Sequence, residues 1–393
     1  MQLTSEQKQF ILTHERQDVR ETALRFVRDD MPLLLAQIAG RQMAEKKIPS
    51  WYAETDIVYP PHLSLEQSSS ELTACYKASL VLGKNETFAD LTGGMGVDFS
   101  FLSPHFREAE YVEQNEDLCR IAEHNFAELG LTNATIHCAG AGTFLRETAP
   151  LDFIYLDPSR RDNIGRKVFR IEDCNPDLSE IKPLLLEKSN KVMVKYSPML
   201  DISLAVKSLG CVSAVHVVSV DNECKELLFL LSEAAVEEPL FIAVNLKKRG
   251  EKELFSFTMV QEQKAVVPFA ENPGHYLYEP NTSILKAGAF KSVAQAYHFQ
   301  KLHINSHLYT SDELVADFPG RVFEVETFFV PNKKNIKIFL QDTKKANITV
   351  RNFPMTVAGI RRKTGLTDGG DIYLFATTFS DERKVWVKCR RVN

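Results

Sequence analysis

The residues from 88 to 102, FADLTGGMGVDFSFL, have the types and spacing that a ligand site requires. Asp90 ends an apolar run, and Gly93, Gly94 and Gly96 follow it. Because glycine lacks a Cβ, a ligand can approach the backbone there, and the helix expected to follow presents its N-terminal amides. A tight strand-to-helix turn without a ligand explains the same glycines, so this motif alone leaves both interpretations open.

Two further carboxylates follow apolar runs in the same way. Glu113 lies twenty-three residues beyond the first aspartate, and Asp157 closes the run in DFIYLDPSRRD. A carboxylate in the position of Glu113 can accept hydrogen bonds from both hydroxyls of a ribose. Pro158 stiffens the chain where it leaves the strand, and Arg160 and Arg161 indicate a pocket edge that faces a polar or anionic substrate. Each motif taken singly is also an ordinary strand end.

Strands that end at one edge of a sheet would bring these residues together. From residue 86 onward, the strand candidates TFADL, AEYVE, TIHCA, DFIYLD and KVMVKY alternate with helical stretches such as EDLCRIAEHNFAELGL. This alternation predicts an α/β fold with a doubly wound, Rossmann-like sheet, in which ligands bind at the carboxyl ends of the strands. SAVHVVSV and ELLFLLS are joined only by DNECK, which is too short for a helical crossover and predicts an antiparallel final hairpin.

The rest of the chain divides by its patterns into further regions. Apolar positions at intervals of three and four residues predict an N-terminal helical region over residues 1–70. We expect the sheet domain over 71–235, a small α+β domain of ferredoxin-like type over 236–320 and a last α+β domain over 321–393. The sequence shows no apolar run long enough to span a membrane and no secretory h-region. Seven scattered cysteines without a CxxC pair favour a reduced, cytoplasmic protein without a zinc ribbon.

The net charge of −5 hides an asymmetry along the chain. Residues 321–393 carry 15 Lys and Arg against 7 Asp and Glu, whereas residues 1–235 carry 24 against 35. A basic tail on an acidic body suits an anionic partner for the tail. A solvated charged surface explains the same counts.

The motifs together resemble those of the class I S-adenosylmethionine-dependent methyltransferases. The resemblance covers about residues 66–235 and rests on FADLTGGMGVD, Glu113, YLDPSRRD and the antiparallel hairpin. A nicotinamide dehydrogenase would lack that hairpin and normally shows G-x-G-x-x-G. The resemblance implies that Asp90 and the three glycines hold the methionyl part of S-adenosylmethionine and that Glu113 binds its ribose.

The same resemblance assigns two more places in the sheet domain. Residues from Ala139 onward would flank the adenine, and Asp157 with Pro158 would line the methyl-transfer site. Many members carry an acidic residue where this chain has Ala139 and Gly140. Adenine recognition would then rely on backbone groups.

The C-terminal stretch VRNFPMTVAGIRRKTGLTDGGDIYLFATT resembles the THUMP-like domain found behind certain RNA methyltransferases. This resemblance implies a structured RNA partner, such as a transfer RNA. Arg361, Arg362 and Lys363 would then contact phosphates, with Arg160 and Arg161 near the methyl-transfer site. A run of three basic residues is also common in a solvated turn.

The residues around Asp157 bear on which atom of the substrate receives the methyl group. Methylation at pyrimidine C5 needs a cysteine nucleophile, and neither DPSRR nor KYSPMLD contains one, while Cys224 falls at the predicted hairpin tip. The aromatic residue that usually follows two prolines in enzymes that methylate exocyclic nitrogens is missing, so a base would stack on Arg160 or Tyr196.

The sequence predicts an RNA methyltransferase without a metal, acting at a nitrogen or ribose acceptor. A methyltransferase of proteins or small molecules and a non-catalytic RNA-binding protein that keeps the fold are the alternatives.

Overall fold

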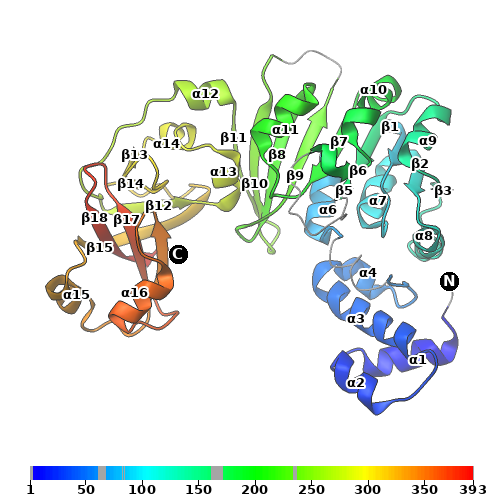
Figure 1. Ribbon diagram of the computed structural model, residues 1–393, viewed down its shortest axis with the longest axis horizontal. Helices are drawn as coiled ribbons and strands as arrows, with labels where there is room; N and C mark the ends of the chain where they lie inside the picture. Colours follow the sequence, from blue (N-terminus) through cyan, green and yellow to red (C-terminus); the bar gives the residue numbers. More distant parts are fainter. Residues whose placement is uncertain are drawn as a thin grey trace. The chain divides into compact units, whose positions relative to one another are not determined.

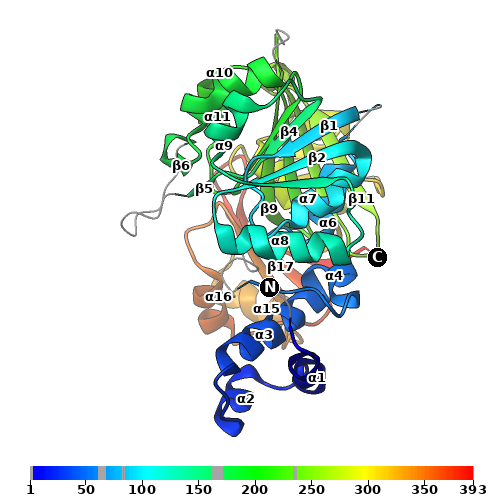
Figure 2. The same cartoon turned by 90° about the vertical axis from the view of Figure 1, so that its right-hand side faces the viewer.

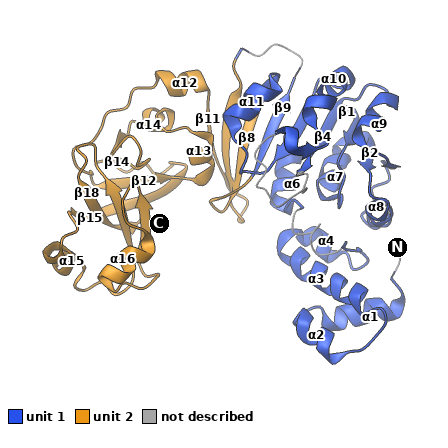
Figure 3. Ribbon diagram, in the orientation of Figure 1, with its two compact units in different colours: residues 1–214, 226–237 blue, residues 215–225, 238–393 orange. Residues whose placement is uncertain are grey.

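The computed structural model describes residues 3–60, 68–81, 83, 85–160, 171–232 and 237–392. The chain divides into two compact units, residues 1–214 with 226–237 and residues 215–225 with 238–393 (Figure 3). The division falls within the hairpin of β8 (Val212–Val220) and β9 (Glu223–Leu231). Within the described ranges, every helix is too short or too polar to cross a bilayer.

The first unit begins with a helical region. It contains α1 (Ser5–His14), α2 (Val19–Arg25), α3 (Met31–Lys47) and α4 (Pro49–Ala53). The side chains of Thr4 and Asp18 cap the first turns of α1 and α2, where they accept hydrogen bonds from the backbone of Gln7 and of Arg20 and Glu21. Trp51, only 1% exposed, packs in one apolar cluster with Met95 and Val97 from the glycine loop and the following helix. This packing attaches the helical region to the sheet that follows.

The sheet of the first unit has the order β9-β7-β4-β1-β2-β3. Its parallel strands are β1 (Asn85–Asp90), β2 (Phe106–Glu113), β3 (Ala134–Cys138), β4 (Phe153–Leu156) and β7 (Val192–Tyr196). Strand β9 runs antiparallel to β7. All residues of β4 and β7 are buried, as parallel strands covered on both faces should be. The prediction of a doubly wound sheet with an antiparallel hairpin is therefore confirmed.

Helices cover both faces of this sheet (Figures 1 and 2). One face carries α6 (Glu71–Ala78), α7 (Val97–Leu102) and α8 (Glu116–Glu128), and the other carries α9 (Ala141–Glu147), α10 (Leu178–Lys188) and α11 (Ile202–Leu209). Short elements fill the connections: η1 (Ser103–His105), η2 (Ile171–Asp173), and the paired strands β5 (Ser159–Arg160) and β6 (Cys174–Asn175). In the second unit, β10 (Leu240–Leu246) and β11 (Lys252–Phe257) form an antiparallel pair.

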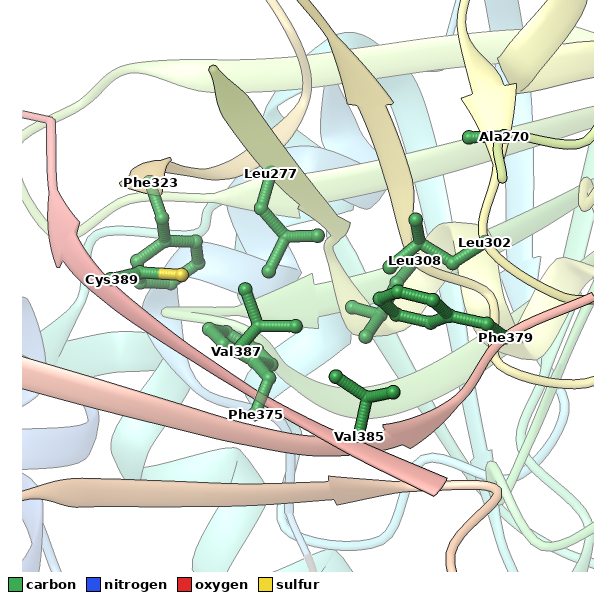
Figure 4. Close-up of a cluster of buried hydrophobic side chains, with 10 residues drawn as sticks. All are labelled: Ala270, Leu277, Leu302, Leu308, Phe323, Phe375, Phe379, Val385, Val387 and Cys389. Atoms are coloured by element: carbon green, nitrogen blue, oxygen red, sulfur yellow. The ribbon is translucent and has the colours of Figure 1, made fainter. Parts of the chain in front are cut away.

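The second unit contains a separate sheet with the order β13-β14-β12-β15-β18-β17-β16. Its strands are β12 (Tyr276–Pro280), β13 (Gln300–Lys301), β14 (Tyr309–Ser311), β15 (Gly320–Phe329), β16 (Asn347–Arg351), β17 (Ile372–Thr378) and β18 (Lys384–Arg391). Its helices are α12 (Met259–Lys264), α13 (Thr282–Ala287), α14 (Ser292–Ala296), α15 (Lys333–Leu340) and α16 (Val357–Thr364). Figure 4 shows one of its apolar cores, in which Leu277, Phe323 and Val387 meet from different strands. The α+β character predicted for the C-terminal part is confirmed.

Candidate active site

The carboxyl ends of the parallel strands surround a cavity of about 500 Å³ in the first unit. This volume is in the range of small-molecule sites. Its lining includes seven of the residues singled out from the sequence: Asp90, Gly93, Gly94, Gly96, Glu113, Ala139 and Asp157. Pro158 is buried outside the lining. Arg161 lies outside the described residues, and of Arg160 the structure describes the backbone in β5 without its side chain.

The glycine loop is attached to the strands on either side of β1. Leu91 donates its backbone N–H to the carbonyl of Tyr155 in β4 over 3.0 Å, and Gly93 donates to Val112 in β2 over 2.9 Å. Gly94 and Gly96 have φ angles of 55° and 85°, which only glycine adopts readily. The loop therefore has a fixed course across three strand ends.

Glu113 completes this attachment with its side chain. One carboxylate oxygen accepts the backbone N–H of Gly94 at 2.9 Å, and the other accepts that of Asn115 at 2.8 Å. Each oxygen keeps further lone pairs for a ligand. Glu113 can thus hold the glycine loop and a polar ligand group at the same time.

Asp90 and Asp157 meet at the opposite side of the loop through Thr92. The backbone N–H of Thr92 donates to Asp90 at 3.0 Å, and its hydroxyl accepts the backbone N–H of Asp157 at 2.6 Å. Burial raises the pKa of Asp90 well above its usual range, against the hydrogen bond from Thr92. Three motifs recognised separately in the sequence form one hydrogen-bonded assembly.

A chain of buried charges that the sequence reasoning missed leads to the cavity. Lys77 in α6, fully buried, donates to both carboxylate oxygens of Glu226 in β9, at 2.7 and 2.8 Å. The same ammonium lies 3.1 Å from a carboxylate oxygen of Asp98 in α7. Asp98 also accepts hydrogen bonds from Tyr155 at 2.6 Å and from Ser69 at 2.7 Å.

Lys195 in β7 continues this chain to the cavity. Its ammonium forms an ion pair and a short hydrogen bond with Asp157, and it lies 3.8 Å from Asp98. Burial disfavours the charged form of Lys195, but Asp157 and Asp98 outweigh it and raise the pKa of the ammonium. Burial also raises the pKa of Asp157, and Lys195 opposes that rise. Lys195 is thus held as a cation beside a carboxylate whose proton affinity is increased.

The exposure of these side chains rises toward the cavity. It is 0% for Lys77, 4% for Glu226, 11% for Lys195 and 35% for Asp157. The sequence held one signal for them, because a charged residue inside an apolar, buried run such as KVMVKY needs a partner. Which partner it finds depends on the fold. Within the described ranges, no group of His, Cys, Asp and Glu is arranged to hold a metal ion.

The basic residues predicted to contact RNA lie in the last turn of α16, in the second unit. Arg361 pairs with Asp368, and Lys363 donates to the carbonyl of Pro331 at 3.1 Å. Arg362 is exposed. Cations in the last helical turn also stabilise the helix dipole, so this position has a structural explanation of its own.

A second basic region lies elsewhere in the second unit and was not singled out from the sequence. Five basic side chains line a cavity of about 600 Å³ together with three acidic ones. The basic residues are Lys247, Lys248, Arg249, Arg321 and Arg391. Three of them are neutralised locally, since Lys247 pairs with Glu253 at 3.1 Å, Lys248 with Asp221 at 3.4 Å and Arg321 with Glu279.

Comparisons with known proteins agree with this geometry. A family model described as a THUMP domain-like domain matches residues 320–391, and one described as a ferredoxin-like domain matches residues 276–319. The crystal structure of a proposed methyltransferase from Porphyromonas gingivalis W83 is 31% identical, with a TM-score of 0.87, over 100% of both chains. The chain belongs to the class I methyltransferases with a C-terminal THUMP-like domain.

Other solved structures resemble this methyltransferase over less of its length. An rRNA methylase from Streptococcus thermophilus is 14% identical over 41% of this chain and 94% of its own, with a TM-score of 0.31. A methyltransferase-like protein from Streptococcus mutans, solved with S-adenosylhomocysteine, is 17% identical over 41% and 96%, with a TM-score of 0.30. At such scores neither match bears on the function. None of the curated protein sequences matches the chain.

Proposed function

We propose that this methyltransferase transfers the methyl group of S-adenosylmethionine to a structured RNA, such as a transfer RNA, at a nitrogen or ribose acceptor. The observation that carries the proposal is the shared cavity of the glycine loop, Glu113 and Asp157 in a chain with a THUMP-like domain. The excess of Lys and Arg over Asp and Glu in residues 321–393 supports an RNA partner over a neutral one.

The lining of the cavity suits S-adenosylmethionine in the room that its glycines leave and in the charges that it presents. A side chain added at Gly140 would meet open space, and one at Gly94 would meet only a carbonyl at 3.6 Å, so both glycines leave room beside the backbone. Asp90, Glu113 and Asp157 present carboxylates that suit the amino group, the ribose hydroxyls and the sulfonium charge. We assign Asp90 and the glycine loop to the methionyl part, Glu113 to the ribose and the backbone from Ala139 to the adenine. When bound, S-adenosylmethionine supplies the electrophilic methyl group, and the protein positions the acceptor for in-line attack.

Label transfer tests the substrate class. The full-length protein is given radiolabelled S-adenosylmethionine with total RNA and total protein, side by side, from cells lacking this gene. We expect label in a small RNA fraction and its loss with Asp157→Ala. Label in the protein fraction alone contradicts the RNA proposal and favours a protein substrate.

Charge reversal tests the assigned RNA contacts in the full-length protein. Replacing both Arg362→Glu and Lys363→Glu should weaken RNA binding and lower the salt dependence of its binding constant by about 2 in the log–log slope, because two phosphate contacts are lost. The matched control replaces the exposed Lys207 and Lys264 with glutamate, which changes the charge equally. Equal binding by the two double variants contradicts the assignment.

A further inference from the structure

The charged groups at the methyl-transfer end of the cavity suggest which acceptor it takes. We propose that the acceptor is a ribose hydroxyl of the RNA, that Asp157 takes its proton, and that Lys195 stabilises the oxygen as the proton leaves. This inference rests on the proposed function, since the hydroxyl belongs to an RNA ribose only if the substrate is RNA.

The sign of the charge at the site carries the inference. The Lys195 ammonium contacts Asp157 at the cavity lining. An amine that attacks a sulfonium methyl group gains positive charge, which a neighbouring ammonium opposes. A hydroxyl becomes negative as its proton leaves, which the same ammonium favours. A site that holds a lysine cation beside the acceptor therefore suits an acceptor that loses a proton.

The two groups at the cavity have different roles because of how each is held. Lys195 is held as a cation by Asp157 and Asp98, so it does not serve as the base. Asp157 forms an ion pair with Lys195, its side chain is the most exposed of the charged chain, and its partial burial raises its pKa. A carboxylate with increased proton affinity that faces the cavity can accept a proton from the substrate.

The reaction balances with S-adenosylmethionine as methyl donor, Asp157 as proton acceptor and solvent. The hydroxyl oxygen forms a bond to the methyl carbon while the carbon–sulfur bond breaks, and that electron pair stays on sulfur. The hydroxyl proton passes to Asp157 and from there to solvent. The products are the methyl ether, the neutral thioether and one released proton.

The cavity lining favours a ribose over a base. Tyr155 is the only aromatic residue among the described lining residues. Its ring is 1% exposed and its hydroxyl is bound to Asp98, so it offers no surface for stacking. Of the two stacking candidates from the sequence, Tyr196 is 4% exposed and does not line the cavity, and the side chain of Arg160 lies outside the described residues. Among the described lining residues no aromatic face is therefore open to a planar base, whereas a ribose needs none.

Buried partners fix the position of Lys195. Asp98 lies between the two lysines, 3.1 Å from Lys77 and 3.8 Å from Lys195, and Glu226 holds Lys77 from the far side. Asp98, Asp157 and Lys195 line the cavity, whereas Lys77 and Glu226 do not. Lys77 and Glu226 are therefore positioning residues.

Alkaline hydrolysis of the methyl-labelled RNA tests the inference. A 2′-O-methyl group blocks cleavage at the adjacent phosphodiester, so label on ribose stays in an alkali-stable dinucleotide, whereas label on a base appears in mononucleotides. Label in dinucleotides supports the inference. Label in mononucleotides overturns it and leaves the RNA methyltransferase intact, while the absence of label from RNA overturns the proposed function itself.

Variants test the roles of the two residues. We expect Lys195→Met and Asp157→Asn each to lower the methylation rate on the order of 100-fold, with S-adenosylhomocysteine still raising the melting temperature. The control is Lys225→Met, an exposed lysine of β9 paired with Glu223, which should keep the wild-type rate. A Lys195→Met protein that methylates at the wild-type rate overturns the role given to this lysine.

Discussion

At the scale of single residues, packing against buried rings requires two of the three loop glycines. A Cβ on Gly93 would lie 2.1 Å from the ring of Tyr111, and one on Gly96 would lie 2.7 Å from the ring of Phe126. Both rings are buried and cannot move aside without disturbing the core. Gly94 is favoured by its backbone instead, since glycine adopts its φ of 55° readily, and a Cβ there would meet only the Thr92 carbonyl at 3.6 Å. The tight turn thus accounts for all three glycines, and Gly94 in addition leaves room for a ligand beside the backbone.

Glu113 connects the loop to the proposed cofactor, so its replacement is the sharpest test at this scale. Glu113→Ala removes both backbone contacts of the carboxylate and any contact to a ribose. We expect the Kd for S-adenosylhomocysteine, measured by calorimetry, to rise about 10- to 100-fold, since hydrogen bonds to a charged group are worth about 1.5–3 kcal/mol each. Glu116→Ala, an exposed neighbour in α8, is the matched control. Unchanged affinity in the Glu113 variant would remove this residue from the site.

At the scale of elements, the buried charges connect two helices to two strands. Lys77 comes from α6, Asp98 from α7, Lys195 from β7 and Glu226 from β9. Removing one partner from such a group leaves an uncompensated buried charge, which costs more than the ion pair contributes. The group therefore fixes the register between helices and sheet near the cavity as well as the position of Lys195.

A double-mutant cycle measures this coupling. Lys77→Met should lower the free energy of unfolding by about 3–5 kcal/mol. The double variant with Lys77→Met and Glu226→Gln should lose less free energy of unfolding than the two single variants summed, by at least about 1 kcal/mol. The reason is that Glu226→Gln removes the carboxylate that Lys77→Met leaves unpaired. The cycle is read by urea unfolding.

The exposed pair of Arg120 and Glu116 in α8, at 3.2 Å, gives the matched control for this cycle. Its coupling energy should stay below about 0.5 kcal/mol, since water screens both charges. Additive effects at Lys77 and Glu226 would mean that the buried pair does not act as a unit.

At the scale of the whole molecule, each unit has its own buried core, and acid should weaken the fold through buried histidine. His216 in β8 is 6% exposed, and burial lowers its pKa from 6.5 to about 4. A histidine with a lowered folded-state pKa contributes its stability in full above the unfolded pKa of 6.5 and loses it as pH falls toward 4. His307, stacked on Phe290, has its pKa lowered to about 4 by the same cause.

The corresponding measurement compares unfolding free energies at pH 7 and pH 4 for the wild type and His216→Gln. The free energy of unfolding of the wild type should fall by about 3 kcal/mol more than that of the variant between pH 7 and pH 4. The difference corresponds to the lowering of the His216 pKa from 6.5 to about 4, at about 1.36 kcal/mol per pKa unit, which the variant lacks. An equal loss in both proteins would show that His216 does not titrate with unfolding.

The sequence by itself determined the order of strands and helices, the glycine loop, and the carboxylates at 90, 113 and 157, because periodicity and strand-end chemistry are local signals. It also contained the THUMP-like pattern. It did not determine which charges meet: Lys77 and Glu226 are 149 residues apart, and only the insertion of β9 beside β7 brings them together. The same holds for Gly93, whose need to be glycine comes from Tyr111 on the next strand. Tertiary structure decided these features because burial makes each charge and each ring depend on partners that no local pattern contains.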